Sequence, residues 1–387
     1  MTIPQGYKQT ELGIIPEDWE VKQISDFTSV VTGGTPSTQH AEYWGGDIRW
    51  MNSGELNLKF VYDVEGRITE EGLNNSSTHI IPAKCVLVGL AGQGKTRGTA
   101  AYNLVSLCTN QSIAAFLPTD THSSLYLYYV IDSLYDYLRL LSSGDGGRGG
   151  LNKQILSLLN IVLPPIAEQR AIAEALSDVD GLIAALDKKI AKKRLLKQGA
   201  MCKLLSLSGR GKKWFNVRLG NVVNIRKGSM LTSDRFVAGN IPVIAGGKIP
   251  AGYHNVANRP ANTITISASG ASAGYVALYN KPIFATDCST IEPCSTYDIH
   301  YIYHLLKYYQ SEIFAMQTGG AQPHVHPSDL NELQILYAKD IEEQRAIATI
   351  LSDMDKEIAD LEAKRDKYRL LKSGMMQKLL TGQIRLK

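Results

Sequence analysis

The chain has 387 residues, which is long enough for two or three domains that each bury a core. Its 44% hydrophobic and 20% charged residues are typical of a soluble globular protein, and no apolar run approaches the roughly 18 residues of a membrane span. The opening residues, MTIPQGYKQTELGIIPEDW, contain no signal peptide, which favours a cytoplasmic protein. Five scattered cysteines without a CxxC pair predict reduced thiols and exclude a disulfide framework.

The net charge of +4 is unevenly distributed. Acidic residues are in excess up to Gly150, whereas basic residues are in excess over residues 151–213. Binding to nucleic acid by charge alone would need a broader basic surface. If the chain binds nucleic acid, we expect a partner to supply part of the contact.

The first part of the chain predicts a β-rich globular domain. Short apolar runs at Cys85–Leu90 and Ser112–Leu117 are separated by glycine-containing turns and are typical of strands. A helical segment, Tyr126–Leu141, and a glycine-rich loop, Ser142–Gly150, follow them.

One stretch of this domain, Gly89–Thr96, matches the phosphate-binding pattern GxxxxGK[S/T]. In that interpretation the chain is a nucleotide-binding protein, with Lys95 on the phosphates and Thr96 on magnesium. A phosphate-binding loop must open a helix, yet Gly98 follows and is a poor helix former. We therefore favour a glycine hairpin that presents Lys95 and Arg97 at the surface.

A long segment of the chain occurs twice. Residues 168–205 and 343–380 align without a gap at an offset of 175, with 24 identities in 38 positions. Both copies have apolar residues at heptad spacing, such as Ile172, Val179 and Leu186 in the first. This periodicity predicts two helices of about 40 residues, roughly 60 Å long, that pack on each other as a coiled coil. The alternative is that each stripe is one face of a globular helix.

The segment between the repeats predicts a second globular domain related to the first. Ile241–Ala245 and Thr263–Ser267 have strand character, Tyr301–Phe314 is helical, and Thr318–Pro327 is a loop. Ala268–Asn280 also aligns with Ala91–Asn103 at an offset of 177. The two globular domains are therefore predicted to share one fold with different loops.

These elements predict an α+β fold with pseudo-two-fold organisation. Two similar β-rich domains are separated by two long helices packed as an antiparallel coiled coil. The predicted boundaries are 1–160 for the first globular domain, 161–210 for the first helical spacer, 211–337 for the second globular domain and 338–387 for the second spacer.

Three stretches carry a resemblance to a known family. They resemble segments of the specificity (S) subunits of type I restriction-modification systems. The stretches are Thr10–Trp19 (TELGIIPEDW), Leu163–Ala173 (LPPIAEQRAIA) and Gly246–Tyr253 (GGKIPAGY). The order of two recognition domains and two helices is similar over essentially the whole chain. The second copy departs at Ala338–Asp340, where the first has Leu163–Pro165.

The resemblance implies a non-catalytic subunit without a cofactor. It implies that each recognition domain reads one half of a bipartite, asymmetric site in double-stranded DNA. It further implies two modification (methyltransferase) subunits as partners, with restriction and translocase subunits in the full complex, and no membrane. The residues agree with this, because two divergent readers on a helical spacer can reach two DNA segments about one helical turn apart. A coiled-coil adaptor that does not bind DNA is the remaining alternative.

Candidate DNA contacts follow from side-chain chemistry, since arginine and lysine suit guanine, asparagine and glutamine suit adenine, and hydroxyls suit phosphate. The candidates are Thr35, Ser37, Arg49, Asn52, Lys95, Arg97 and Arg148 in the first domain and Arg226, Lys227, Ser229, Lys248, Ser269, Gln322 and His324 in the second. Asn110 and Gln111 are either DNA contacts or parts of a structural turn.

The end of each repeat predicts a partner surface, because its paired leucines exceed what one helical seam can bury. The candidates are Leu195, Leu196, Lys197, Leu204, Leu370, Leu371, Lys372 and Leu379. The alternative for the basic residues is solubilising charge near a helix C-terminus. No catalytic cluster is found, and the pairs His300/His304 and His324/His326 lack the third ligand of a metal site.

Overall fold

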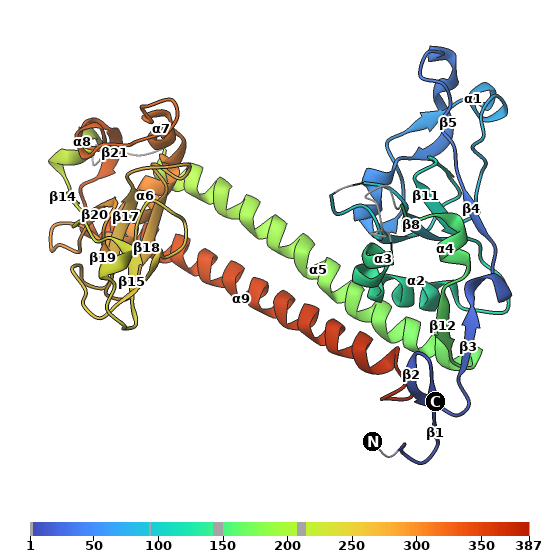
Figure 1. The fold of residues 1–387 in the computed structure, drawn as a ribbon. Helices are drawn as coiled ribbons and strands as arrows, with labels where there is room; N and C mark the ends of the chain where they lie inside the picture. The colour runs from blue at the N-terminus through green and yellow to red at the C-terminus, as the bar shows by residue number, and fades with distance from the viewer. Residues whose placement is uncertain (1–2, 93, 142–149, 207–213, 387) are drawn as a thin grey trace. The chain divides into compact units, whose positions relative to one another are not determined.

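The chain divides into two compact units in the computed structural model, which describes residues 3–92, 94–141, 150–206 and 214–386. Unit 1 comprises Met1–Ala185 and Arg365–Lys387, and unit 2 comprises Leu186–Lys364. The long helices α5 (Ile166–Leu205) and α9 (Ile341–Leu379) contribute residues to both units (Figure 1).

Unit 1 is built on a five-stranded sheet of order β4-β11-β8-β9-β6, beside a three-stranded sheet of order β10-β5-β7. Helix α2 packs against β8 and β9 and buries Tyr126, Tyr128 and Tyr129. The strands are β1 (Tyr7–Thr10), β2 (Gly13–Pro16), β3 (Glu20–Gln23), β4 (Val30–Thr32), β5 (Trp44–Met51), β6 (Phe60–Val61), β7 (Arg67–Ile68), β8 (Val86–Gly89), β9 (Ala100–Asn103), β10 (Cys108–Thr109), β11 (Ile113–Phe116) and β12 (Asn160–Leu163). The short helices are α1 (Glu70–Asn74), α2 (Ser124–Ser133), α3 (Tyr135–Leu141) and α4 (Lys153–Ser157).

Unit 2 has a four-stranded sheet of order β14-β20-β17-β18 and a three-stranded sheet of order β16-β15-β19. Helix α6 packs against β17 and β18, as α2 does against the corresponding strands of unit 1. The strands are β13 (Trp214–Arg218), β14 (Ile225–Lys227), β15 (Ile241–Ile244), β16 (Gly252–His254), β17 (Thr263–Ser267), β18 (Val276–Tyr279), β19 (Phe284–Ala285), β20 (Cys288–Ile291) and β21 (Gln334–Ala338). The short helices are α6 (Ile299–Tyr308), α7 (Gln310–Ala315) and α8 (Pro327–Glu332).

The two units have the same topology. The run β4-β11-β8-β9 corresponds to β14-β20-β17-β18, and the parallel pair of β5 with β10 corresponds to that of β15 with β19. Unit 1 has a second parallel pair, β6 with β9. A further antiparallel pair joins the start of each unit to the strand before its long helix, β3 with β12 and β13 with β21. The predicted fold class is confirmed. Segments of unit 1 without a counterpart in unit 2, such as β6 and α1, are additions to a shared scaffold, in which β7 corresponds to β16.

Each predicted short helical segment is in fact two helices. Tyr126–Leu141 breaks at Leu134 and Tyr301–Phe314 breaks at Tyr309, where ψ rises to 11° and 17°. The two break points are 175 residues apart. In unit 1, Ser133 lies next to the break and its hydroxyl donates to the carbonyl of Val130 at 2.6 Å, which competes with helix continuation.

The long helices pack antiparallel within each unit. In unit 1, Ile172 and Leu176 at the start of α5 share a core with Leu379 near the end of α9. In unit 2, Leu205 at the end of α5 shares a core with Leu351 near the start of α9. The predicted mutual packing of the repeats is thereby confirmed.

One ion pair occurs in both units at equivalent positions. Lys372 Nζ lies 2.8 Å from Asp180 Oδ1 in unit 1, and Lys197 pairs with Asp355 in unit 2. Adding 175 to Asp180 gives Asp355, and subtracting 175 from Lys372 gives Lys197. Both lysines are buried by more than four-fifths. They occupy seam positions, because Lys197 follows Ile190 by seven residues. The same pair therefore fixes the helix register twice.

The residue that packs on this ion pair differs between the units. Tyr129 donates its hydroxyl hydrogen to Asp180 Oδ2 at 2.8 Å in unit 1. The equivalent residue in unit 2 is His304, with Nε2 3.0 Å from Ser352 Oγ and Nδ1 4.0 Å from Asp355 Oδ2. Burial, together with Lys197 and His300, lowers the pKa of His304 to about 3, although Asp298 opposes the shift.

A tryptophan anchors each globular part to the first turn of a long helix. Trp19 Nε1 donates to Glu168 Oε2 at 3.0 Å in unit 1, and Trp214 Nε1 donates to Glu343 Oε1 at 2.9 Å in unit 2. Arg385 also binds Glu168 through two nitrogens at 2.7 Å each. Burial raises the pKa of Glu168, but the bonds from Arg385 and Trp19 outweigh it, so the pKa is lowered. The carboxylate also suits the positive end of the helix dipole.

We expect Lys197→Met to lower the free energy of unfolding by roughly 2 kcal/mol, because it leaves the Asp355 carboxylate half-buried without its cation. Arg345→Met serves as the control, since the pair of Arg345 with Glu342 is exposed and should contribute less than about 0.5 kcal/mol. Urea unfolding measures both. Equal effects of the two variants would contradict a structural role for the seam pair.

The depressed pKa of His304 predicts a loss of stability in acid. The unfolded chain binds a proton near pH 6.5, whereas the folded chain resists it down to about pH 3, so stability falls as the pH drops below about 6.5. The slope should be on the order of 1 kcal/mol per pH unit, measured by urea unfolding between pH 7.5 and 5.

His304→Tyr, which installs the residue of unit 1, should remove this part of the slope. Replacement of the exposed His79 by Gln is the control and should leave the slope in place. An unchanged slope in the His304→Tyr variant contradicts the assignment.

Candidate nucleic-acid interface

Four loops of each unit gather at one edge, where a parallel strand pair ends. In unit 1 the amide of Asn110, just after β10, donates to Met51 at the end of β5 at 3.0 Å. In unit 2 the amide of Thr286, just after β19, donates to Ile244 at the end of β15 at 2.8 Å. Because the paired strands are parallel, the loops that follow both strands leave from the same edge.

A glycine brings a third loop to this edge. A Cβ atom on Gly33 would lie 1.8 Å from the carbonyl oxygen of Thr109, and one on Gly228 would lie 2.0 Å from that of Thr286. Only glycine permits this backbone approach. Gly33 and Gly228 therefore occupy the same structural position, and the residues after them lie at the edge.

The hairpins β8–β9 and β17–β18 bring the fourth loop. Leu90 donates its amide to Ser112 at 2.8 Å, and Ala268 donates to Asp287 at 3.2 Å. We call the gathered segments the loop edge. It comprises residues 33–37, 51–52, 90–92, 94–97 and 109–112 in unit 1, and 228–231, 245–249, 268–275 and 286–287 in unit 2.

Three candidates of unit 1 lie at its loop edge and have hydrogen-bond partners within the unit. Thr35 Oγ1 donates to Gln111 Oε1 at 2.6 Å, and the carbonyl of Ser37 accepts from Trp44 Nε1 at 3.2 Å. Asn52 caps the following 3-10 turn by accepting from the amide of Gly54 at 2.8 Å. These bonds fix the side chains of Thr35 and Asn52 and the backbone of Ser37.

Asn110 and Gln111 both contribute to local structure. Asn110 Oδ1 accepts from the amide of Ser112 at 3.1 Å, which is an Asx turn, and Gln111 holds Thr35. Their contacts support the structural alternative for this pair.

Arg49 lies within β5, before the loop edge, and carries a counter-ion. Its Nε is 2.8 Å from Asp63 Oδ1, and Arg67 binds the same carboxylate. The hydrogen bond from Arg49, followed by the backbone bond of Val64, lowers the pKa of Asp63. The charge of Arg49 is therefore largely balanced within the unit.

The described residues of the stretch 89–96 connect the antiparallel strands β8 and β9, and those after it enter β9 without a helix. This geometry contradicts the nucleotide-binding alternative and confirms the hairpin. Helix α3 holds the loop, because Tyr135 Oη donates to the carbonyl of Lys95 at 3.1 Å and Arg139 donates to that of Gly94 at 2.6 Å. Lys95 and Arg97 are thus carried on a braced loop, whereas Arg148 lies outside the described residues.

Ser269 and His324 meet at the loop edge of unit 2. Their backbones form a β-bridge, and Ser269 donates its hydroxyl hydrogen to Asp287. The ring of His324 stacks on that of His326 with centroids 6.2 Å apart. Gln322 is exposed on the same loop.

Two lysines share one aromatic ring beside this edge. Lys248 Nζ lies 5.5 Å and Lys307 Nζ 4.9 Å from the ring centroid of Tyr275. Burial, Lys197 and Lys248 lower the pKa of Lys307, while Asp355 opposes them. The ring offsets part of the repulsion between the ammonium groups, and an anion such as a phosphate would relieve more of it. The sequence carried no sign of this site, since Tyr275 and Lys307 are far apart along the chain.

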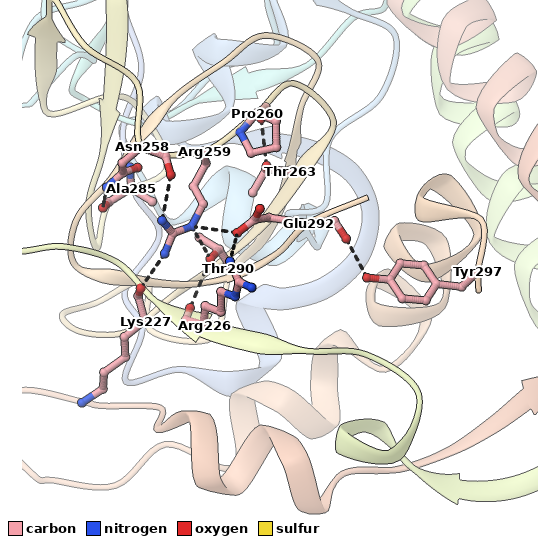
Figure 2. Close-up of polar contacts among 10 residues, drawn as sticks. All are labelled: Arg226, Lys227, Asn258, Arg259, Pro260, Thr263, Ala285, Thr290, Glu292 and Tyr297. Atoms are coloured by element: carbon pink, nitrogen blue, oxygen red, sulfur yellow. Dashed lines mark hydrogen bonds and ion pairs between the residues drawn. The ribbon is translucent and has the colours of Figure 1, made fainter. Parts of the chain in front are cut away.

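Figure 2 shows the contacts that Arg259 and Glu292 make with the strand bearing Arg226 and Lys227. We call Arg259 and Glu292 the clasp. The guanidinium of Arg259 donates to the carbonyl of Lys227 at 2.7 Å and to the hydroxyl of Thr290 at 2.8 Å. Glu292 lies 3.3 Å from Arg226 and 3.5 Å from Arg259. Arg226 is therefore engaged by a carboxylate, whereas the ammonium group of Lys227 points away from the clasp.

The partner-surface candidates divide into two groups. Leu195, Leu196, Leu370 and Leu371 are each at least half exposed. The others are held within the units: Lys197 and Lys372 in the seam ion pairs, Leu204 half-buried against a core, and Leu379 buried in one. In unit 1 the exposed Leu370 and Leu371 line an apolar groove with Met375 and Ile384.

The described residues give little support for a metal site, a disulfide framework or a membrane helix. They contain no group of three side chains that could hold a metal ion, and all five cysteines are unpaired thiols. Among the helices of these residues, none combines the length and apolar character needed to cross a membrane.

Comparison with known proteins identifies the family. A family model described as "Type I restriction modification DNA specificity domain" matches residues 16–193 and again residues 211–368. The chain belongs to this family. The non-catalytic role expected of a specificity subunit is confirmed by this membership.

Individual relatives agree with the assignment. The MjaVIII specificity subunit of Methanocaldococcus jannaschii is 24% identical over 99% of this chain and 97% of its own length. The MjaIX specificity subunit of the same organism is 36% identical, but over 46% of this chain and 41% of its own length. The crystal structure of a type I restriction-modification S subunit from M. genitalium has a TM-score of 0.71 at 19% identity, and the match covers 98% of each chain. That likeness shows a shared fold.

The close approach of Gly228 to Thr286 predicts that Gly228→Ala destabilises the specificity subunit by about 3 kcal/mol, because a backbone carbonyl must move. Gly247→Ala is the matched control on the next loop, where the nearest atom to a new Cβ is 3.5 Å away. Thermal unfolding compares them. Equal melting temperatures would contradict the packing described for this edge.

Proposed function

We propose that the chain is the sequence-specific DNA-binding subunit of a type I restriction-modification complex, and that each unit reads one half of a bipartite, asymmetric site through its loop edge. The observation that carries the proposal is the repeated loop edge. In both units, candidate DNA-binding residues from separate segments converge at the end of the same parallel strand pair. The scaffold is the same in both units, while the side chains on it differ, as two different half-sites require.

In this proposal, residues 1–160 and 211–337 are the two target-recognition domains. Residues 161–210 and 338–387 are the spacers, whose helices set the distance between the half-sites. A helix of 40 residues is about 60 Å long and stiff enough to act as a ruler. The two lysines on Tyr275 and the hairpin lysine, Lys95, are positioned to contact phosphates.

We also propose that the exposed leucine pairs dock two modification subunits, which restriction and translocase subunits join in the full complex. Both pairs are Leu-Leu in an identical Arg-Leu-Leu-Lys context, so two copies of one partner can bind in the same way. The apolar groove beside Leu370 and Leu371 suits an apolar partner segment. The seam lysines contribute indirectly, by fixing the helices that carry the leucines.

Exchange of residues 211–337 for the second recognition domain of another specificity subunit should change one half of the methylated site only. Sequencing of methylated bases in a host that carries the exchanged gene reads the result directly. The unmodified gene is the control. A change in both halves would contradict modular reading, and methylation that is independent of this chain would favour the adaptor alternative.

Replacement of Leu370 and Leu371 by serine should reduce the number of bound modification subunits from two to one, because the other leucine pair is intact. Leu182→Ser, at an exposed leucine of α5 outside both pairs, is the control and should leave two bound. Mass measurement of the purified complex counts them. Two subunits on the double variant would contradict the docking proposal.

A further inference from the structure

Two large apolar side chains stand out on the loop edge of unit 2. Met230 is 92% exposed and Ile249 is 77% exposed, and they are the most exposed large apolar residues of the described chain. Exposed apolar side chains of this size contribute nothing to a core. Their position at a candidate DNA-binding edge calls for a role outside the unit.

The backbone presents Met230 outward on a fixed loop. The amide of Ser229 donates to Ala285 at 2.9 Å, and the amide of Leu231 donates to the hydroxyl of Thr286 at 3.2 Å. Both neighbours of Met230 are thus tied to the end of β19. The methionine stands between the two ties with its side chain in solvent.

Ile249 is presented in a similar way. Its loop connects β15 to β16, and it is closed by the amide of Ala251, which donates to Val243 at 2.9 Å. Gly246 brings the start of this loop against Ser269, since a Cβ there would lie 2.5 Å from the Ser269 carbonyl oxygen. Lys248, the residue before Ile249, is held over Tyr275.

Each apolar side chain therefore has a basic or hydroxyl neighbour with a chemistry suited to phosphate. Lys227 and Ser229 precede Met230, and Lys248 precedes Ile249. Proteins read bases partly through apolar contacts, either with the methyl group of thymine or as a wedge between base steps. A methionine suits such a contact because its side chain is flexible and polarisable.

The position of unit 1 that corresponds to Met230 carries a different side chain. Gly33 corresponds to Gly228 by its contact with the strand end, so Thr35 corresponds to Met230. Thr35 is polar and bonded to Gln111. A position that the scaffold holds constant while its side chain changes is where sequence choice is expected.

We propose that Met230 and Ile249 are specificity-determining residues that make apolar contact with bases of the half-site read by unit 2. This inference rests on the proposed function. It assigns base reading to two residues outside the polar candidates, and it leaves phosphate binding to Lys227 and Lys248.

The test uses the complex of the chain with its modification subunits and a duplex that contains the host's methylated site. Met230→Ala and Ile249→Ala are compared with Val256→Ala, at a residue that is 55% exposed and lies just outside the small sheet of unit 2. Val256 follows β16 next to the start of β15, at the end opposite the loop edge. Lys248→Ala is a second comparison, for loss of a phosphate contact.

We expect Met230→Ala and Ile249→Ala each to weaken binding of the cognate duplex about tenfold, which is the effect of losing one base contact. Binding to a scrambled duplex and the dependence of affinity on salt should not change. Lys248→Ala should weaken binding to both duplexes and lower the salt slope by about one. Val256→Ala should match the unmodified complex.

The inference is overturned if the Met230 and Ile249 variants bind the cognate duplex like Val256→Ala. It is also overturned if they lose affinity equally for both duplexes, since that pattern indicates no base contact. Failure of the proposed function looks different, because the unmodified complex would then bind both duplexes alike. Melting temperatures equal to that of the unmodified chain exclude misfolding as the cause.

Discussion

The antiparallel pairing of α5 with α9 is the constraint on which the rest of this specificity subunit depends. Apolar residues fill the seam at its ends, and a lysine–aspartate pair occupies the same seam position in each unit. A charged pair in a seam adds little net stability, because desolvation offsets the attraction. It does penalise any shift of register strongly, since a shifted lysine would be buried without its partner. The repeated pair therefore specifies the alignment of the helices rather than simply strengthening it.

Residues near the start of each globular part attach it to one of the paired helices. A tryptophan in the opening strand region of each unit binds a glutamate in the first turn of a long helix. The strand that precedes that helix pairs with an early strand of the same unit, β12 with β3 and β21 with β13. Each sheet is thus tied to a helix by both a side chain and a backbone ladder. The loop edge can diverge between the units, because its residues can change without loss of the core.

Much of this architecture could be predicted from the sequence, because it rests on local patterns. The heptad spacing predicts the long helices, and the short apolar runs separated by glycine-containing turns predict the central strands. The loop edge could not be predicted, since it depends on contacts such as Gly228 with Thr286, which are distant along the chain. The split of each short helical segment was missed for a different reason, because it depends on backbone angles at Leu134 and Tyr309.

The candidate site residues illustrate the same limit. Lys197 and Lys372 are predicted on a partner surface because they adjoin the paired leucines, whereas in the structure both continue the heptad register and lie in the seam ion pairs. The heptad spacing of these two lysines predicts a seam position, and it is a better guide here than the charge of the side chain. Arg49 and Arg226 were chosen for their guanidinium groups, and only the structure brings Asp63 and Glu292 to them. Exposed apolar residues such as Met230 give no signal in the sequence, because exposure is a property of the fold.

The most direct measurement of the central claim is crosslinking of the two helices in the full chain. Cysteines introduced at positions 197 and 355, or at 180 and 372, with Cys202 and Cys294 replaced by serine, should react within one chain with a short bismaleimide. A pair shifted by one heptad, at positions 197 and 362, should react much less, because the shift moves the partner by about 10 Å along the helix. Equal crosslinking of matched and shifted pairs, or crosslinking only between separate chains, would contradict the single register proposed for both units.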